Sequence, residues 1–133
     1  MRKRKIVTRF QDYVLSIILK PDSVFRAKVV YLILSKDTDE AFELLSQRYN
    51  VPKPKLKVGM SKRYSKNPAC YVSKNRTIHI SYRENLWNPH LILHEFYHHL
   101  RREKDAQGGI EKYADKFAIK YLQAYQKLVT HET

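Results

Sequence analysis

Residues 94–98 have the spacing of a pair of metal ligands. They read H-E-x-x-H, and on a helix two side chains four residues apart lie one above the other, roughly 6 Å apart at Cβ. Two imidazoles can then bind one ion. Glu95 is turned by about 100° from His94, so its carboxylate can overhang the ion without ligating it and accept a proton from a water. The pattern predicts two ligands, His94 and His98, and a general base, Glu95.

Zinc is the metal that this donor set favours. Imidazole suits zinc, and catalytic zinc sites combine three protein ligands with one open position. The segment GGIEKYADKFA supplies a third ligand, Glu111, in the first turn of the next expected helix. Asp115 follows four residues later on the same face, where its carboxylate can accept the ring N–H of a ligating histidine and fix its tautomer.

Two helices, expected over 88–105 and 110–130, carry these residues. Asn88 is a good N-cap, and Pro89 suits the first helical position. The first helix should end before the glycine pair Gly108 and Gly109, which lets the chain turn back. Apolar residues at helical spacing form a broad stripe along the second helix. The ligands are therefore expected on two consecutive helices joined by a short turn.

The rest of the chain predicts N-terminal helices followed by a small sheet. Residues 1–50 read as helical, and short β-branched and aromatic runs predict strands within 55–82, two of them joined by a hairpin turn at 74–76. The candidate helix caps and breakers are Asp22 or Ser23, Asp37 or Thr38, and Pro52 with Pro54. This order predicts one α+β domain over 1–133 with a short, mainly antiparallel sheet.

The composition is typical of a soluble, basic protein with one domain. The chain has 133 residues, 43% of them apolar, enough for a modest core. Lysine and arginine outnumber aspartate and glutamate by 26 to 13, and this excess attracts polyanions, so nucleic acid stays open as a secondary partner. The single cysteine, Cys70, cannot form an internal disulfide. We expect no membrane insertion, because the apolar runs are far shorter than roughly 20 residues, and a cytoplasmic location, because no complete export signal is recognisable.

Other histidines and tyrosines have competing roles. His99 is turned about 100° from His98, and we expect it at the surface. His90 lies one helical turn before His94 and either lines the site or is solvated. His79 lies on a strand expected at the sheet edge, where the strand either holds an extended substrate or is merely blunted by polar side chains. Three tyrosines are either core residues or candidates for stabilising an oxyanion: Tyr113, Tyr121 and Tyr125.

HEFYHH, the short glycine turn and E-x-x-A-D-x-F-A together resemble the gluzincins, zinc peptidases whose third ligand is a glutamate on the helix after H-E-x-x-H. In particular, the chain is similar to the minigluzincins over about 71–122, whereas the first fifty residues have no counterpart there. The resemblance implies a small zincin-like fold and a bound Zn²⁺ ion. It also implies the same roles for the site residues: ligands His94, His98 and Glu111, base Glu95, and Asp115 as partner of a ligand.

These residues predict a zinc metalloendopeptidase that hydrolyses peptide bonds of a peptide or protein substrate with a metal-activated water. The alternatives are a basic nucleic-acid-binding module with a structural metal or none, and a zincin that binds metal but has lost activity. Minigluzincins are made as latent precursors, so the resemblance also implies that the C-terminal segment can block the site. His131 or Glu132 would then be the contacting side chain, within one molecule or by exchange between two.

Overall fold

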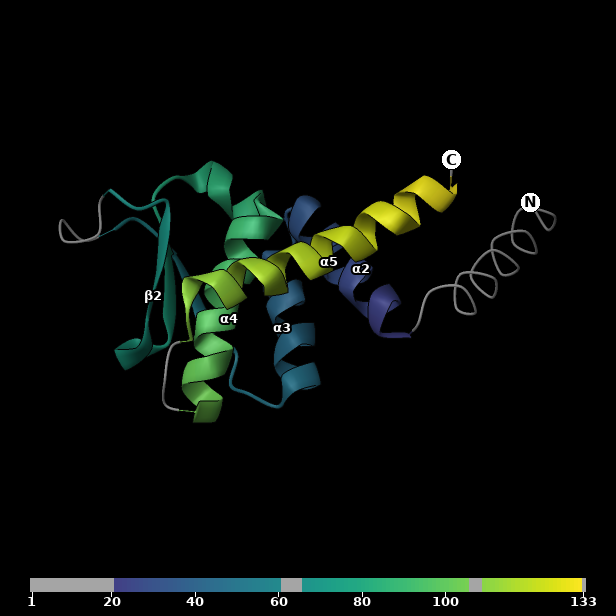
Figure 1. Ribbon diagram of the computed structural model, residues 1–133. Coiled ribbons are helices and arrows are strands. Elements are labelled where there is room, and N and C mark those ends of the chain that lie inside the picture. The colour runs from purple at the N-terminus through teal and green to yellow at the C-terminus, as the bar shows by residue number, and fades with distance from the viewer. Residues whose placement is uncertain (1–20, 61–65, 106–108, 133) are drawn as a thin grey trace.

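The computed structural model describes residues 21–60, 66–105 and 109–132, which form an α+β fold (Figure 1). The helices are α2 (Pro21–Leu34), α3 (Thr38–Tyr49), α4 (Pro89–Asp105) and α5 (Glu111–Glu132). The strands are β1 (Lys55–Val58), β2 (Ala69–Val72) and β3 (Thr77–Ile80), with short 3-10 helices η2 (Ser73–Asn75) and η3 (Arg83–Trp87). The predicted α+β class is confirmed. The helix expected within residues 1–20 lies outside the described residues.

Helices α2 and α3 pack as a pair, and only one of the cap residues predicted for them is confirmed. Asp37 caps α3 by accepting a hydrogen bond from the Glu40 N–H, as predicted. Thr38 instead begins the helix and donates its hydroxyl to the Leu86 carbonyl at 2.7 Å. Neither Asp22 nor Ser23 is a cap, because α2 begins at Pro21; Asp22 lies in the first turn and pairs with Arg48 across the helix pair.

The sheet is mixed, so the mainly antiparallel arrangement was wrong. Its strand order is β1-β3-β2, with β3 parallel to β1 and antiparallel to β2. The hairpin turn at 74–76 is confirmed: η2 joins β2 to β3, and Arg76 takes the left-handed conformation that reverses the chain. The hairpin places β3 between the other two strands. His79 therefore lies on the central strand, not at the edge.

Helices α4 and α5 follow the expected boundaries. The Asn88 side chain accepts a hydrogen bond from the Leu91 N–H at 3.2 Å, and Pro89 is the first helical residue. Gly109 precedes α5 with φ of +74°, and a Cβ there would lie 2.7 Å from the Tyr97 ring. Glycine is therefore required at this position both for backbone conformation and for space.

The core lies where these helices meet the sheet. Figure 1 shows α4 between the sheet and the α2–α3 pair, with α5 crossing α4 and α2. The Phe96 ring is fully buried and stacks on Phe42 at 5.9 Å between centroids. Members of the core come from every helix and from the sheet: Val29, Val30, Ile33, Phe42, Leu45, Ile78, Ile80, Ile92, Leu93, Phe96, Ala118 and Tyr121. One continuous core thus holds α4 and α5 in place.

Within the described segments, no helix has both the length and the apolar character that crossing a bilayer requires.

The first prediction tests whether α2 belongs to the core, using two consecutive residues of that helix. Ile33 is fully buried and Leu34 is 44% exposed. Ile33→Ala should lower the free energy of unfolding by about 2–5 kcal/mol, because it removes buried methyl groups and leaves a cavity. Leu34→Ala should change it by about 0.5 kcal/mol. Urea unfolding followed by circular dichroism measures both, and equal losses would contradict the packing.

Candidate metal centre

Three predicted ligand side chains meet where α5 begins over α4. His94 Nε2 lies 2.9 Å from Glu111 Oε2, and His98 Nε2 lies 2.7 Å from Glu111 Oε1. The two imidazole side chains are 12% and 13% exposed, whereas the Glu111 side chain is 77% exposed. Their ligand atoms all lie within 4.8 Å of one another. Two imidazoles and one carboxylate from two helices thus converge as a group that could hold a metal.

Asp115 lies where the sequence predicted it, behind a candidate ligand. Its Oδ1 is 2.8 Å from His94 Nδ1, so the imidazole donates this N–H and directs Nε2 toward Glu111. His90 lies on the other side of the same carboxylate, with Nε2 3.8 Å from Asp115 Oδ1 and a side chain that is 44% exposed. Both expectations for His90 therefore hold, because it lines the cleft and is also half in solvent.

Glu95 lies close to the two imidazoles. Its Oε2 is 3.9 Å from His94 Nε2, and the residue is 7% exposed. Burial raises the pKa of its carboxyl, while the neighbouring His94 and His98 and a hydrogen bond with the Tyr71 backbone act in the opposite direction. Glu95 is thus a nearly enclosed carboxylate that faces the ligand group without joining it.

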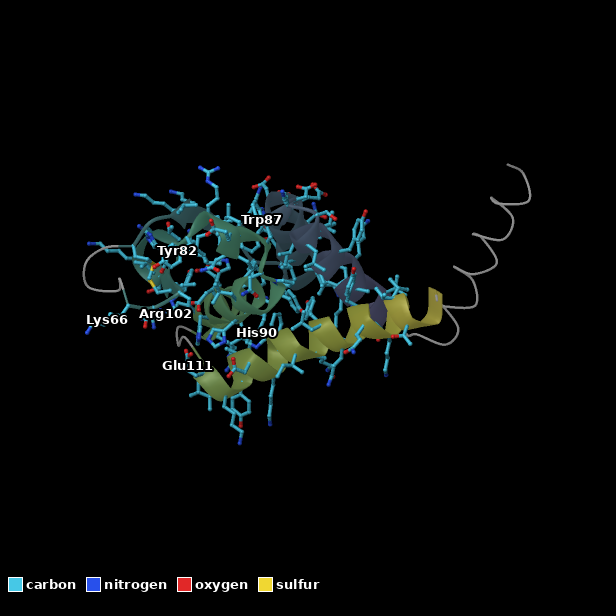
Figure 2. All side chains as sticks on the ribbon, turned by 90° about the horizontal axis from the view of Figure 1, so that it is seen from above. Lys66, Tyr82, Trp87, His90, Arg102 and Glu111 are labelled. Atoms are coloured by element: carbon cyan, nitrogen blue, oxygen red, sulfur yellow. The ribbon has the colours of Figure 1, made fainter. Side chains whose placement is uncertain are left out.

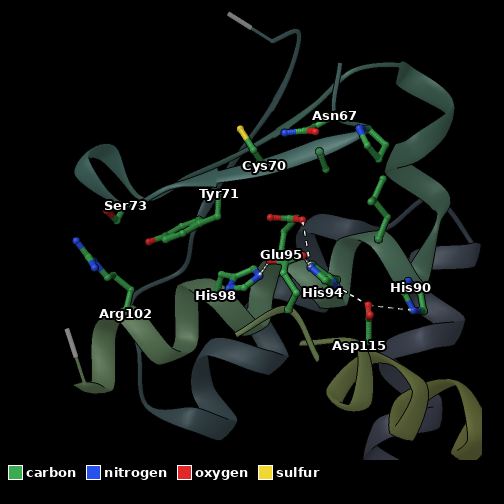
Figure 3. A pocket seen from close by; sticks show the side chains of 14 residues that line it. Asn67, Cys70, Tyr71, Ser73, His90, His94, Glu95, His98, Arg102 and Asp115 are labelled. Carbon is green, nitrogen blue, oxygen red and sulfur yellow. Dashed lines mark hydrogen bonds and ion pairs between the residues drawn. The ribbon is translucent and has the colours of Figure 1, made fainter. Parts of the chain in front are cut away.

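The ligands line a cleft of about 680 Å³ between α4, the start of α5 and strand β2. Figure 3 shows β2 along one side of this cleft and the imidazoles of His94 and His98 on the other. Figure 2 shows Glu111, His90 and Arg102 on the same side of the molecule, and all three belong to the cleft lining. Among the described residues β2 is an edge strand, so β2 and not the strand of His79 is the edge that borders this cleft.

His99 corrects the expectation of a surface residue, because it is fully buried. Its Nε2 donates to the Pro52 carbonyl at 2.7 Å, which leaves Nδ1 to accept the Tyr71 hydroxyl at 2.8 Å. Burial lowers the pKa of this imidazole. The signal was present in the sequence: Ile92, Phe96 and His99 are spaced by four and three residues, so His99 continues the core stripe of α4.

Some other expected residues lie away from the cleft. Tyr113 is 50% exposed with Lys116 over its ring, and Tyr121 is buried with its hydroxyl bonded to that of Tyr49. Tyr125 is partly buried against the core. Among the described residues, the tyrosine that lines the cleft is Tyr71, on β2, which sequence reasoning had not singled out.

The C-terminal residues are not brought to the cleft within one chain. Helix α5 continues from Glu111 to Glu132, and at 1.5 Å per residue this carries the backbone of His131 about 30 Å from Glu111. The side chains of His131 and Glu132 lie outside the described residues. A block within one molecule would require the last turns of α5 to unwind, whereas exchange between two molecules stays a prediction.

No family model, curated protein or solved structure matches this chain.

The second prediction concerns the buried His99. His99→Ala should lower the free energy of unfolding by about 2–4 kcal/mol, since it opens a cavity where the buried imidazole was and removes the part-buried hydrogen bonds to the Tyr71 hydroxyl and the Pro52 carbonyl. The control is His90→Ala, whose side chain is half exposed and which should change this free energy by about 0.5 kcal/mol. Urea unfolding with EDTA present measures both without a contribution from bound metal. Equal effects would show that His99 has no such role.

Proposed function

We propose that this protein is a zinc-dependent peptidase of the gluzincin type, with the metal held by His94, His98 and Glu111. The observation that carries the proposal is the meeting of two imidazole Nε2 atoms with both oxygens of one carboxylate, at 2.9 and 2.7 Å. Two imidazoles and a carboxylate are a known donor set of catalytic zinc, which keeps a further position for water or substrate.

The contacts of the two ring nitrogens of His94 support a cation at this point. Its two ring nitrogens face carboxylates of Asp115 and Glu111, and a neutral imidazole carries only one N–H. With that proton on Nδ1, the Nε2 lone pair faces a carboxylate oxygen, an arrangement that a cation between them stabilises.

Glu95 supplies the proton transfer. When bound, zinc activates a water and polarises a carbonyl oxygen. The Glu95 carboxylate would accept a proton from the attacking water and deliver it to the leaving amine. Its enclosure limits competing solvent, and the Tyr71 backbone hydrogen bond helps to keep it ionised and oriented. Asp115 holds the imidazole of His94 in one tautomer throughout.

Strand β2 is suited to hold the peptide. Six residues between Asn67 and Ser73 line the cleft, and among the described residues β2 pairs with a strand, β3, on one side only. An extended peptide can therefore add to the free edge through backbone hydrogen bonds, which give affinity with little demand on side chains. This arrangement supports hydrolysis of a peptide bond in an extended segment as the proposed reaction.

The third prediction is that the purified protein binds one zinc per chain. His94→Ala and Glu111→Ala should lose it, because each removes a ligand. Asp115→Ala should weaken zinc affinity by about 10- to 100-fold, since only the orientation of His94 is lost. Lys112→Ala, an exposed neighbour of Glu111 on α5, is the matched control and should bind normally. Elemental analysis and chelator competition measure these effects, and full zinc content in both ligand variants would show that the site is assigned wrongly.

The fourth prediction tests the activity itself. Glu95→Gln should keep its fold and its zinc but cleave an unfolded protein substrate about 10³-fold more slowly, because an amide cannot accept the proton. Glu84→Gln, an exposed carboxylate on η3, makes the same chemical change away from the cleft and should cleave at the wild-type rate. Equal cleavage rates in the two variants would contradict the role of Glu95.

One observation favours a second function, binding of a polyanion. The formal net charge is +13, and exposed lysines recur along α5 at helical spacing: Lys112, Lys116, Lys120 and Lys127. Such a face attracts phosphates in a salt-dependent manner. Nucleic-acid binding that falls with salt and is unchanged in Glu95→Gln, together with no cleavage by the zinc-loaded wild type, would favour this second function over the first.

A further inference from the structure

The charges that line the cleft are arranged unevenly. Three carboxylates and three imidazoles occupy its middle and one end, and Arg102 is the one lysine or arginine among the described residues of the lining. The chain as a whole contains 26 lysines and arginines, and of those that the structure describes Arg102 is the one that faces the ligand group across this lining. Arg102 is therefore the permanent cation of this lining, and the role inferred for it below rests on the proposed function.

Arg102 extends the row of ligand residues along α4. It follows His98 by one helical turn, about 6 Å along the axis, just as His90 precedes His94. Figure 3 shows Arg102 near Ser73 and the Tyr71 hydroxyl at one end of the cleft, and His90 with Asp115 at the other. The two ends thus differ in charge, with a permanent cation at one and a carboxylate–imidazole pair at the other.

The wall beside Arg102 is held in place by buried contacts. The Tyr71 hydroxyl donates to His99, and the two rings meet edge to face at 5.3 Å. Burial and Glu103 raise the pKa of Tyr71, while Arg76 and Arg102 act against them, so the charge of Arg102 is felt at this ring. The carboxylate of Glu103, the next residue along the helix, pairs with Arg76 at 3.1 Å.

We propose that the Arg102 end of the cleft is a carboxylate subsite, which binds an acidic group of the peptide substrate. A guanidinium binds carboxylates through paired hydrogen bonds, a geometry that lysine cannot reproduce. An extended peptide advances about 3.3 Å per residue, so the 6 Å between His98 and Arg102 places this group about two residues from the bond that is cleaved.

The direction of the peptide decides which carboxylate arrives there. Strand β2 runs from the Asn67 end of the cleft to the Ser73 end, beside Arg102 (Figure 3). A peptide added antiparallel to β2 brings its residues before the cleaved bond to Arg102, so the carboxylate is an acidic side chain. A parallel peptide would bring its C-terminal carboxylate instead. Antiparallel pairing is the more stable of the two, and we expect the acidic side chain.

The fifth prediction separates binding at this subsite from cleavage. Zinc-loaded Glu95→Gln protein is titrated into short fluorescent peptides that carry one glutamate or one glutamine at successive positions, each with a free or an amidated C-terminus. Fluorescence anisotropy should show about tenfold tighter binding of the best glutamate peptide than of its glutamine counterpart. Adding Arg102→Gln should abolish this preference, and Arg102→Glu should reverse it, so that the glutamine peptide binds more tightly than the glutamate peptide.

The matched control is Arg83→Gln, an exposed arginine on η3 outside the cleft lining. Because the net charge of +13 attracts any acidic peptide, only the difference between the two arginine variants reports the subsite. A second pattern also supports the subsite: peptides with a free C-terminus bind more tightly than amidated ones, glutamate and glutamine peptides bind equally, and Arg102→Gln removes the preference for the free C-terminus. The peptide would then lie parallel to β2.

The subsite is overturned if no peptide binds, or if the preference for a carboxylate survives Arg102→Gln. The proposed function fails separately. If wild-type protein with full zinc cleaves none of the peptides but the Arg102-dependent preference persists, the subsite stands without the peptidase activity. If wild-type protein cleaves glutamate and glutamine peptides at the same rate, and Arg102→Gln changes nothing, the activity stands and the subsite is wrong.

Discussion

The contact of the Glu111 carboxylate with the imidazoles of α4 is the constraint on which the rest of the arrangement depends. It requires the chain to leave α4, reverse and begin α5 directly over the ligand pair. Gly109 permits this because its backbone has a positive φ and the Tyr97 ring lies where a Cβ would be. The fully buried Ala114 and Ala118 then let α5 pack closely on the core.

Helix α4 has to present two chemically different faces at once. Phe96 packs into the core against Phe42, while His94 and His98 face the cleft. His99 links these faces, because its bond to Tyr71 ties strand β2 to the helix and its bond to Pro52 ties the chain before β1 to the same point. The two sides of the cleft, helix α4 and strand β2, are therefore held in fixed positions by the core. A binding site needs such support to keep its geometry.

Local patterns predicted the parts of this site that depend on neighbours in sequence. Asn88 and the H-E-x-x-H spacing indicated α4, and the glycine turn indicated that Glu111 would return to it. The order of the strands could not be predicted this way, because pairing β1 with β3 depends on residues more than twenty positions apart, such as Leu56 and Ile78. The position of Arg102 in the cleft also depends on contacts between distant parts of the sequence, because strand β2 forms the opposite side of the cleft.

The distribution of charge explains how a strongly basic protein can present an acidic site. Glu95, Glu111 and Asp115 are three of only 13 acidic residues, yet they meet within one cleft. Charges farther away than about 8 Å are largely screened at physiological ionic strength, so these carboxylates, and not the net charge, decide whether a cation is stable there. Helix α5 contributes both acidic and basic groups. Its carboxylates Glu111 and Asp115 face the cleft, while its lysines are exposed to solvent. Acidic peptides are thus attracted by the outer surface and repelled by the carboxylates at the centre, and Arg102 is the charged group of the lining that can bind them beside that centre.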